Sequence, residues 1–203
     1  MSAFPVFLTD RRTRSSVDAH LVEGITSDHL QQVEETWQPA VARHIQGLIS
    51  SGAPRSDWPQ SWHWDWPKKM SALGNLLAYR NFAITRNGRL QGLMIVKTEG
   101  YRARGPNQTG QHLVYIDYVE TAPWNRRPIV SEPEFSGVGT VFMRAAIEIS
   151  REEGFYGRIG LHSLPQSEPF YRRLNMTELG ADSSKQNLTY FEMTSEQADA
   201  FSS

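Results

Sequence analysis

The sequence predicts one α/β domain over residues 1–203, with a mixed, mostly antiparallel central sheet flanked by helices. Two observations lead to this prediction. The chain has 203 residues, of which 39% are hydrophobic and 21% charged, enough for one sizeable core and too few for two. Along the chain, segments with the pattern of strands alternate with segments that have the spacing of amphipathic helices.

The N-terminal part of the chain predicts a short strand followed by a long helix. Ala19 to Ile25 has a strand-like pattern, and Thr26-Ser27-Asp28 supplies capping side chains for a helix that reaches about Ile49. Apolar residues follow at three- and four-residue spacing: Leu30, Val33, Trp37, Val41, Ile45 and Leu48. We interpret this stripe as part of the core.

The segment from Ser51 to Lys69 is rich in proline and tryptophan, so it predicts a loop or a broken helix. It contains four of the chain's 6 tryptophans: Trp58, Trp62, Trp64 and Trp66. Two interpretations remain open. With His63 and Asp65 between them, the rings suit a binding surface, or they cover the edge of a sheet.

The middle of the chain predicts a hairpin and one further strand. Leu76 to Thr85 and Leu90 to Lys97 are apolar runs, and the Asn87-Gly88 pair between them supplies the positive φ angles that a tight hairpin needs. His112 to Thr121 reads as the next strand, ended by Pro123.

The last part of the chain predicts two helices and three strands. A helix runs from Gly137 to about Glu153, a strand from Gly157 to His162, and a second helix from Pro165 through Leu174. Two strands follow, near Met176 to Leu179 and Asn187 to Met193.

Composition excludes several classes of function. The 21 basic and 22 acidic residues give a net charge of -1, which disfavours nucleic acid and anionic membrane as partners. The 0 cysteines exclude disulfides, thiolate metal sites and a cysteine nucleophile, and they are compatible with a reducing cytoplasm. No membrane span or secretion signal is recognised, so we expect a cytoplasmic protein. The sequence does not fix the oligomeric state and is compatible with a homodimer.

One junction indicates an anion site. The strand ending at Val119-Glu120-Thr121 leads through a connector to Ser136-Gly137-Val138-Gly139-Thr140, which opens a helix. A helix N-terminus presents unpaired N–H groups, and glycine lets a phosphate approach the backbone closely. Such a turn can hold a pyrophosphate, although a Gly-x-Gly pair alone often makes only a turn.

The segments that follow raise this signal. They read Gly157-Arg158-Ile159-Gly160-Leu161-His162-Ser163 and Glu168-Pro169-Phe170-Tyr171-Arg172-Arg173-Leu174-Asn175-Met176. In this order and spacing, the motifs resemble the GNAT superfamily of acyl-coenzyme A N-acyltransferases, over about a third of the chain. The resemblance implies transfer of the acetyl group of acetyl-coenzyme A to a primary amine by direct attack, with no metal and with the cofactor in a cleft between two central strands.

The resemblance also implies which residues hold acetyl-coenzyme A. Backbone groups near a bulge or splay in the strand would bind the pantetheine arm, and the glycine turn would bind the pyrophosphate. Arginines after the strand would add positive charge, unless they are solvated loop residues. The implied set is Val119, Thr121, Arg126, Arg127, Ser136, Gly137, Val138, Gly139 and Thr140.

Two positions depart from the pattern of the family. Glu134 stands where GNAT proteins usually have Gln or Arg, and its charge is expected to repel phosphate, with Ser136 and Thr140 as compensating groups. Leu164-Pro165-Gln166-Ser167 stands where many members place an asparagine and an alanine. Both departures favour an alternative in which a GNAT-like domain binds acyl-coenzyme A or a protein partner without catalysis.

Direct acetyl transfer needs a neutral amine, donors for the oxyanion and an acid for the departing thiolate. The resemblance assigns the acid to Tyr171, whose other interpretation is a core tyrosine. Three residues compete as the base: Glu120, Asp117 and His162. Asp117 and Glu120 are three residues apart in one strand, so their side chains are expected on opposite faces. We favour Glu120.

The acceptor side is expected to be formed by residues 1–70, and the core with the acetyl-coenzyme A site by residues 71–203. Trp62, Trp64 and Asp65 are the candidate acceptor contacts. No motif selects the amine, which can be a protein lysine, a protein N-terminus, a polyamine, an amino sugar or an aminoacylated RNA.

Overall fold

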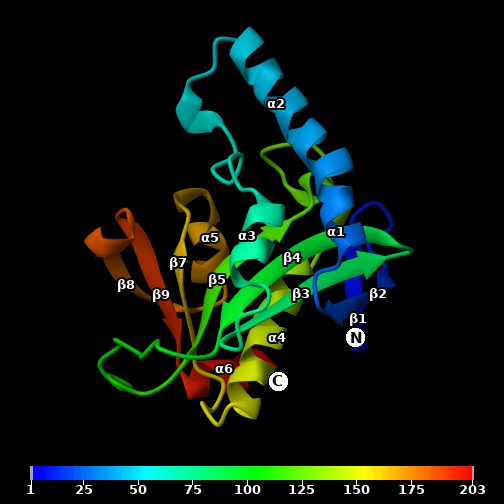
Figure 1. Ribbon diagram of the computed structural model, residues 1–203. Helices are drawn as coiled ribbons and strands as arrows, with labels where there is room; N and C mark the ends of the chain where they lie inside the picture. Colours follow the sequence, from blue (N-terminus) through cyan, green and yellow to red (C-terminus); the bar gives the residue numbers. More distant parts are fainter. Residues whose placement is uncertain (1, 203) are drawn as a thin grey trace. The chain divides into compact units, whose positions relative to one another are not determined.

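The computed structural model describes residues 2–202, which form nine strands and six α-helices (Figure 1). The chain divides into two compact units made of interleaved segments. The first unit comprises Met1–Leu76, Asn81–Leu93 and Val119–Val141, and the second comprises Leu77–Arg80, Met94–Tyr118 and Phe142–Ser203. Within residues 2–202 no helix is long and apolar enough to cross a membrane.

The first unit contains five strands in the order β6-β1-β2-β3-β4. Strand β1 pairs antiparallel with β2 and also with the two-residue β6, where Thr9 lies opposite Ser136. The bounds are β1 (Ala3–Asp10), β2 (Ser16–Glu23), β3 (Tyr79–Arg86), β4 (Arg89–Lys97) and β6 (Phe135–Ser136), the last residues of β4 and the first of β3 belonging to the second unit.

The helical part of the first unit precedes β3. Thr26 caps α1 through a reciprocal pair of hydrogen bonds with His29. The helix then continues through a π-helical turn into α2, and the chain returns beside α2 in the segment 52–65, at the top of Figure 1. The bounds are α1 (Ser27–Gln32), η1 (Val33–Trp37), α2 (Gln38–Ser50), η2 (Arg55–Asp57), α3 (Trp66–Leu73) and η3 (Pro123–Asn125).

The second unit contains four strands in the order β5-β7-β9-β8. Strands β7, β8 and β9 pair antiparallel, whereas β5 and β7 pair parallel. The bounds are β5 (Val114–Thr121), α4 (Val138–Glu152), β7 (Ile159–Ser163), η4 (Pro165–Ser167), α5 (Glu168–Arg173), β8 (Thr177–Asp182), η5 (Ser183–Lys185), β9 (Leu188–Met193) and α6 (Ser195–Ser202). The end of β5 and the start of α4 belong to the first unit.

The predicted fold class, an α/β fold with a mixed and mostly antiparallel sheet, is confirmed. The β3–β4 hairpin turns at Asn87 and Gly88, whose φ angles of 50° and 75° are the positive values expected from the sequence. Strand β1 has no counterpart in the sequence prediction, because Pro5 within it argues against a strand. Pro5 is tolerated because its nitrogen faces away from β2, on a side of β1 where β6 pairs only with Thr9 and Asp10.

The apolar stripe of the long helix is only partly core, which corrects the interpretation made from its spacing. Val33 and Trp37 are buried, but α2 contains no buried residue. Val41 and Ile45 are half-buried, and they line a cavity. Helical spacing shows that one face is apolar, and it does not show whether that face meets a core or an open site.

Candidate functional site

Strands β5 and β7 separate within the second unit. Their parallel register joins Val114 to Ile159, Tyr115 to Gly160 and Ile116 to Leu161, and it ends there. Both strands continue, β5 through Asp117 and Tyr118 and β7 through His162 and Ser163. Backbone groups beyond the last pair are therefore not used in a ladder between these two strands.

The turn that opens α4 is held by side-chain amides of the first unit. Gln91 of β4 accepts hydrogen bonds through Oε1 from Trp124 Nε1 and Asn125 Nδ2, both at 3.0 Å. Asn125 Oδ1 in turn accepts from the backbone N–H of Phe135 at 3.0 Å. Gly137 follows with φ of 100°, a conformation that L side chains rarely adopt. The chain between the end of β5 and α4 is thus fixed at both ends.

Glu134 is neutralised by a partner that the sequence did not reveal. Its Oε2 lies 2.6 Å from Arg89 Nη1, and the same guanidinium stacks 3.6 Å from the centroid of the Trp124 ring. The backbone carbonyl of Glu134 also accepts from Arg11 N. The carboxylate is therefore turned to a cation of its own, which removes much of the repulsion expected from its place before the glycine turn.

Three arginines lie around a shallow cavity of about 650 Å³ beside Glu134 and Phe135. They are Arg11 and Arg12, from the turn after β1, and Arg127, from the connector. Asp10 and Glu132 also line this cavity, so its charge is mixed. Of the two arginines predicted as cofactor ligands, Arg127 lies here, whereas Arg126 is directed to Glu120.

Comparisons with known proteins give a consistent fold. No family model matches the sequence, and no curated protein matches it. Among solved structures, the PaiA N-acetyltransferase of Thermoplasma acidophilum, in complex with coenzyme A, aligns over 86% of this chain and 98% of its own at 12% identity, with a TM-score of 0.50.

Two further structures align in the same way. A Desulfovibrio desulfuricans protein described as a GNAT-family acetyltransferase covers 87% of this chain and 99% of its own at 11% identity, with a TM-score of 0.52. FeeM, an N-acyl amino acid synthase from uncultured soil microbes, covers 90% and 94% at 8% identity, with a TM-score of 0.53. The chain has the GNAT fold.

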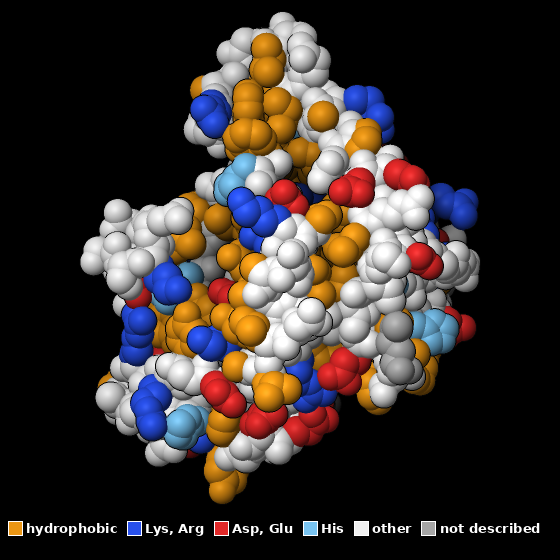
Figure 2. All heavy atoms as spheres, in the orientation of Figure 1, with side chains coloured by type: hydrophobic (Ala, Val, Ile, Leu, Met, Phe, Trp, Pro, Cys, Tyr) orange, Lys and Arg blue, Asp and Glu red, His pale blue; other side chains and the backbone are white. Residues whose placement is uncertain are grey.

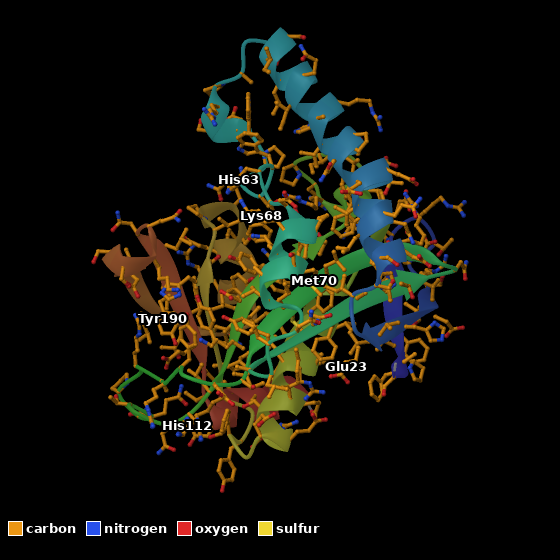
Figure 3. All side chains as sticks on the ribbon, viewed as in Figure 1. Glu23, His63, Lys68, Met70, His112 and Tyr190 are labelled. Atoms are coloured by element: carbon orange, nitrogen blue, oxygen red, sulfur yellow. The ribbon has the colours of Figure 1, made fainter. Side chains whose placement is uncertain are left out.

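Within this GNAT fold, the tryptophan-rich segment borders a cavity of about 470 Å³ in the first unit. All three predicted acceptor residues, Trp62, Trp64 and Asp65, line it, and Glu120 lines it too. Figure 2 shows hydrophobic side chains gathered between α2 and the segment 52–65, and Figure 3 shows His63 where this segment turns back towards α3. The structure thus brings together the predicted acceptor contacts and one of the three candidate bases.

Glu120 is held by three donors. Its Oε1 accepts from Ser61 Oγ at 2.5 Å and from Arg126 Nη1 at 3.0 Å, and its Oε2 accepts from Trp66 Nε1 at 2.6 Å. Burial lowers the pKa of Arg126, and the charge of Glu120 opposes that shift. An ionised carboxylate has about four acceptor sites. Three are occupied by the protein, so one on Oε2 is open to a further donor.

Asp117 has different surroundings. It lies in the second unit. Burial is the main reason why the pKa values of the Tyr115 and Tyr118 phenols are raised, and the negative charge of Asp117 raises both further. The hydrogen bond with Tyr101 is the main cause that raises the pKa of Lys185, and the charge of Asp117 adds to it. Alternation along a strand predicts opposite sides of β5 for Asp117 and Glu120.

His162 lies in a hydrogen-bonded row between the buried Tyr115 and the partly exposed Asp182. Its Nδ1 is 2.7 Å from the Tyr115 hydroxyl, and its Nε2 is 3.0 Å from Asp182 Oδ2. Hydrogen bonds from Ser184, Arg104 and His162 hold the pKa of Asp182 well below its usual range, so this carboxylate accepts and Nε2 carries the proton. Nδ1 then accepts from Tyr115. Both ring nitrogens are therefore engaged with protein groups.

Tyr171 lies on α5 and is 4% exposed. Its ring packs against Phe191 of β9 at a centroid distance of 5.6 Å and against Phe170 at 5.2 Å. Burial raises the pKa of its hydroxyl above the ordinary value. The phenol is therefore protonated at neutral pH.

Sequence reasoning missed the side chains that support the candidate residues: Ser61, Trp66, Arg89, Gln91, Asn125, Arg11 and Arg12. Most of these contacts join residues far apart in the chain, such as Ser61 and Glu120, 59 positions apart. The residues that the structure describes contain no group of three or more His, Asp or Glu side chains that could hold a metal ion.

Proposed function

We propose that this protein is an N-acetyltransferase that moves the acetyl group of acetyl-coenzyme A to a primary amine by direct attack. The observation that carries the proposal is the end of the β5–β7 register at Ile116 and Leu161. A parallel pair that separates while both strands continue leaves backbone donors for an extended ligand, such as the pantetheine arm. Acetyl-coenzyme A fits this feature, and the resemblance of the fold supports it.

The phosphates of acetyl-coenzyme A are assigned to the start of α4. The first-turn N–H groups of Val138, Gly139 and Thr140 have no partner within an α-helix and carry partial positive charge. Ser136 and Gly137 precede them, and Gly137 presents no side chain to the ligand. Arg127 is the arginine that we retain as a phosphate contact, since Arg126 is paired with Glu120.

The chemistry is assigned to two side chains. Glu120 removes a proton from the acceptor ammonium, and the neutral nitrogen then attacks the thioester carbonyl carbon, so that a C–N bond forms and the C–S bond breaks. The backbone N–H groups of Val119 and Thr121 bind the pantetheine arm and polarise the carbonyl. Tyr171 gives its proton to the departing thiolate and regains one when the attacking nitrogen loses its second proton on forming the amide. Burial raises the pKa of this phenol, which keeps it protonated but makes it a weaker acid than an ordinary tyrosine. Of the other two candidate bases, His162 has both ring nitrogens occupied, and strand alternation predicts that Asp117 faces away from the acceptor.

The test combines binding and turnover. Isothermal titration with acetyl-coenzyme A should show one saturable site, and free thiol should appear only when an amine from a panel of primary amines is added. Binding without thiol release for every amine would favour the alternative of a non-catalytic acyl-coenzyme A-binding domain. Absence of binding would refute the proposal.

A further inference from the structure

The tryptophan cavity carries an inference about the acceptor, and it rests on the proposed function. Its volume of about 470 Å³ is in the range of small-molecule sites. It lies wholly within the first unit, and its lining includes five of the chain's 6 tryptophans: Trp37, Trp58, Trp62, Trp64 and Trp66.

One wall of this cavity is an apolar helix face. Val33, Trp37, Val41 and Ile45 follow one another at intervals of four residues and all line the cavity. The α2 members are only half-buried, since no residue of α2 is buried. Apolar surface that faces an open cavity gains free energy when an apolar ligand displaces water from it.

The opposite wall is a set of aromatic rings with fixed mutual orientations. Trp58 and Trp62 meet edge to face at 5.5 Å, and Trp64 and Trp66 do so at 6.3 Å. The Arg55 guanidinium lies 5.4 Å from the centroids of both Trp58 and Trp62. Rings that are held in this way offer edges and faces to another aromatic group.

The polar groups of the cavity select a cation. Among the described residues that line it are two carboxylates, Glu120 and Asp65, and no lysine or arginine. Glu120 keeps one acceptor site, although Arg126 offsets part of its charge. Asp65 uses Oδ1 to cap α3 through Lys68 N, at 2.9 Å. One ammonium group is therefore accommodated. The cations beside the lining are already engaged, Arg55 and Lys69 with its tryptophan rings and Arg126 with Glu120.

One residue of the lining carries a buried donor without a hydrogen-bond partner, in a ring that also packs edge to face on Trp124 at 6.3 Å. Trp37 is 3% exposed, and its indole Nε1 has no hydrogen-bond partner among the residues that the structure describes. Buried N–H groups without partners are rare in folded proteins, and they call for an explanation such as an absent ligand or water. An ether, hydroxyl or carbonyl oxygen on the ligand would satisfy this donor.

From these contacts we infer that the acceptor is a small monoamine with a large apolar body, preferably an aryl group. The ammonium lies at Glu120 and the aryl group between the α2 face and the tryptophan rings. A polyamine would place further charges against apolar walls, which costs free energy because a charge loses its hydration there. A zwitterionic amino acid would bring an uncompensated carboxylate.

The test compares matched amines in the thiol-release assay. Phenylethylamine should exceed ethylamine in kcat/KM by about 10- to 100-fold, the effect of burying one aromatic group, and it should also exceed phenylalanine and spermidine. The same amine is titrated into the protein while tryptophan fluorescence is followed, because five of the 6 tryptophans line the cavity. Saturable quenching is the expected result.

Two variants on one helix provide the control. Ile45 lines the cavity, whereas Ile49, one turn later, is 50% exposed and is not part of the lining. Ile45→Ala and Trp62→Ala should raise the KM for phenylethylamine several-fold and leave the Kd for acetyl-coenzyme A unchanged, and Ile49→Ala should change neither.

The outcomes separate the two proposals. A preference for spermidine, phenylalanine or a peptide with N-terminal phenylalanine would overturn the monoamine inference and leave the acetyltransferase proposal intact. Failure to bind acetyl-coenzyme A would overturn the acetyltransferase proposal, while the fluorescence titration would still support or refute the aryl-amine site. Equal KM changes in Ile45→Ala and Ile49→Ala would also count against the site.

Discussion

Trp66 and Glu120 are joined by a hydrogen bond of 2.6 Å between indole Nε1 and carboxylate Oε2, although 54 positions separate them in the chain. Trp66 is completely buried at the start of α3, and Glu120 lies near the end of β5. The bond therefore ties the tryptophan-rich segment to the strand that carries the candidate base.

The first prediction concerns Glu120. Glu120→Gln removes the charge and places an amide NH₂ among three donors, so one buried donor loses its acceptor. Thermal unfolding should show a loss of about 1–3 kcal/mol, and thiol release should fall by about 10²–10⁴-fold if this residue is the base. Asp117→Asn on the same strand is the control. A larger loss of turnover in Asp117→Asn would move the base to the other face of β5.

The second prediction concerns the Arg89–Glu134 pair. Because Arg89 already neutralises Glu134, Glu134→Gln should change the affinity for coenzyme A by no more than a few-fold. Arg89→Gln leaves the carboxylate without its partner near the glycine turn and should weaken binding more. The double variant should recover most of that loss, and titration calorimetry over the four proteins gives the coupling. Strictly additive effects would show that the pair has no bearing on the phosphate site.

A third prediction concerns the backbone at Gly137. An added Cβ would have its nearest neighbours in Leu8 at 3.9 Å, so Gly137→Ala fits in space. Its φ of 100° is nevertheless unfavourable for alanine and should cost about 1–2 kcal/mol. Gly47→Ala in α2, where no atom lies within 4 Å, is the control and should be neutral or stabilising. Coenzyme A should bind more weakly to the first variant only. Equal unfolding free energies in the two variants would contradict the assignment of strain.

The elements with strong local signals could be predicted from sequence. The Asn87-Gly88 pair predicted the position of the hairpin, because few other residue pairs adopt two consecutive positive φ angles. The Ser136-Gly137-Val138-Gly139-Thr140 segment marked the start of α4, which begins at Val138. By contrast, β6 is two residues long and exists only because Ser136 pairs with Thr9. No local pattern encodes a strand of that length.

The candidate site was predictable only in part. Trp62, Trp64 and Asp65 stood out by composition, and the structure places them in one cavity with Glu120. The partners of Glu120 come from segments that fold together only in three dimensions, so spacing could not identify Ser61 or Arg126 in that role. The apolar stripe on α2 shows the converse. Its spacing correctly predicted one apolar face, but that face borders a cavity and not the core.

The fourth prediction is a pH dependence of stability that arises from His162. Burial holds the pKa of His162 below 6.5, and Asp182 opposes this only in part. Between the two pKa values the unfolded chain binds more protons than the folded one, so stability falls as the pH falls through that window. Asp182 contributes with the same sign, but only below about its own unfolded pKa of 3.8.

Urea denaturation at pH 7, 6 and 5 checks this prediction. Wild type should lose more unfolding free energy than His162→Gln on acidification. His29 must be tested in parallel, because burial also lowers its pKa. Its titration therefore also lowers the unfolding free energy as the pH falls. If the unfolding free energies of wild type and His162→Gln fall in parallel with pH, His162 has the same pKa in the folded and the unfolded state.

The last prediction concerns Tyr171 as the general acid. Tyr171→Phe removes only the hydroxyl and keeps the ring packed against Phe191. Turnover should therefore fall by about 10²–10⁴-fold, the range for a positioned proton donor, while the Kd for acetyl-coenzyme A and the melting temperature change little. Phe170→Leu, on the neighbouring position of α5, is a packing control and should act mainly on stability. The decisive measurement is kcat under conditions where chemistry limits the rate, because a residue that acts only in the transition state affects kcat and not binding. If kcat for Tyr171→Phe remains within a few-fold of wild type, the thiolate leaves without this acid, and the buried phenol serves the packing of α5 on β9 instead.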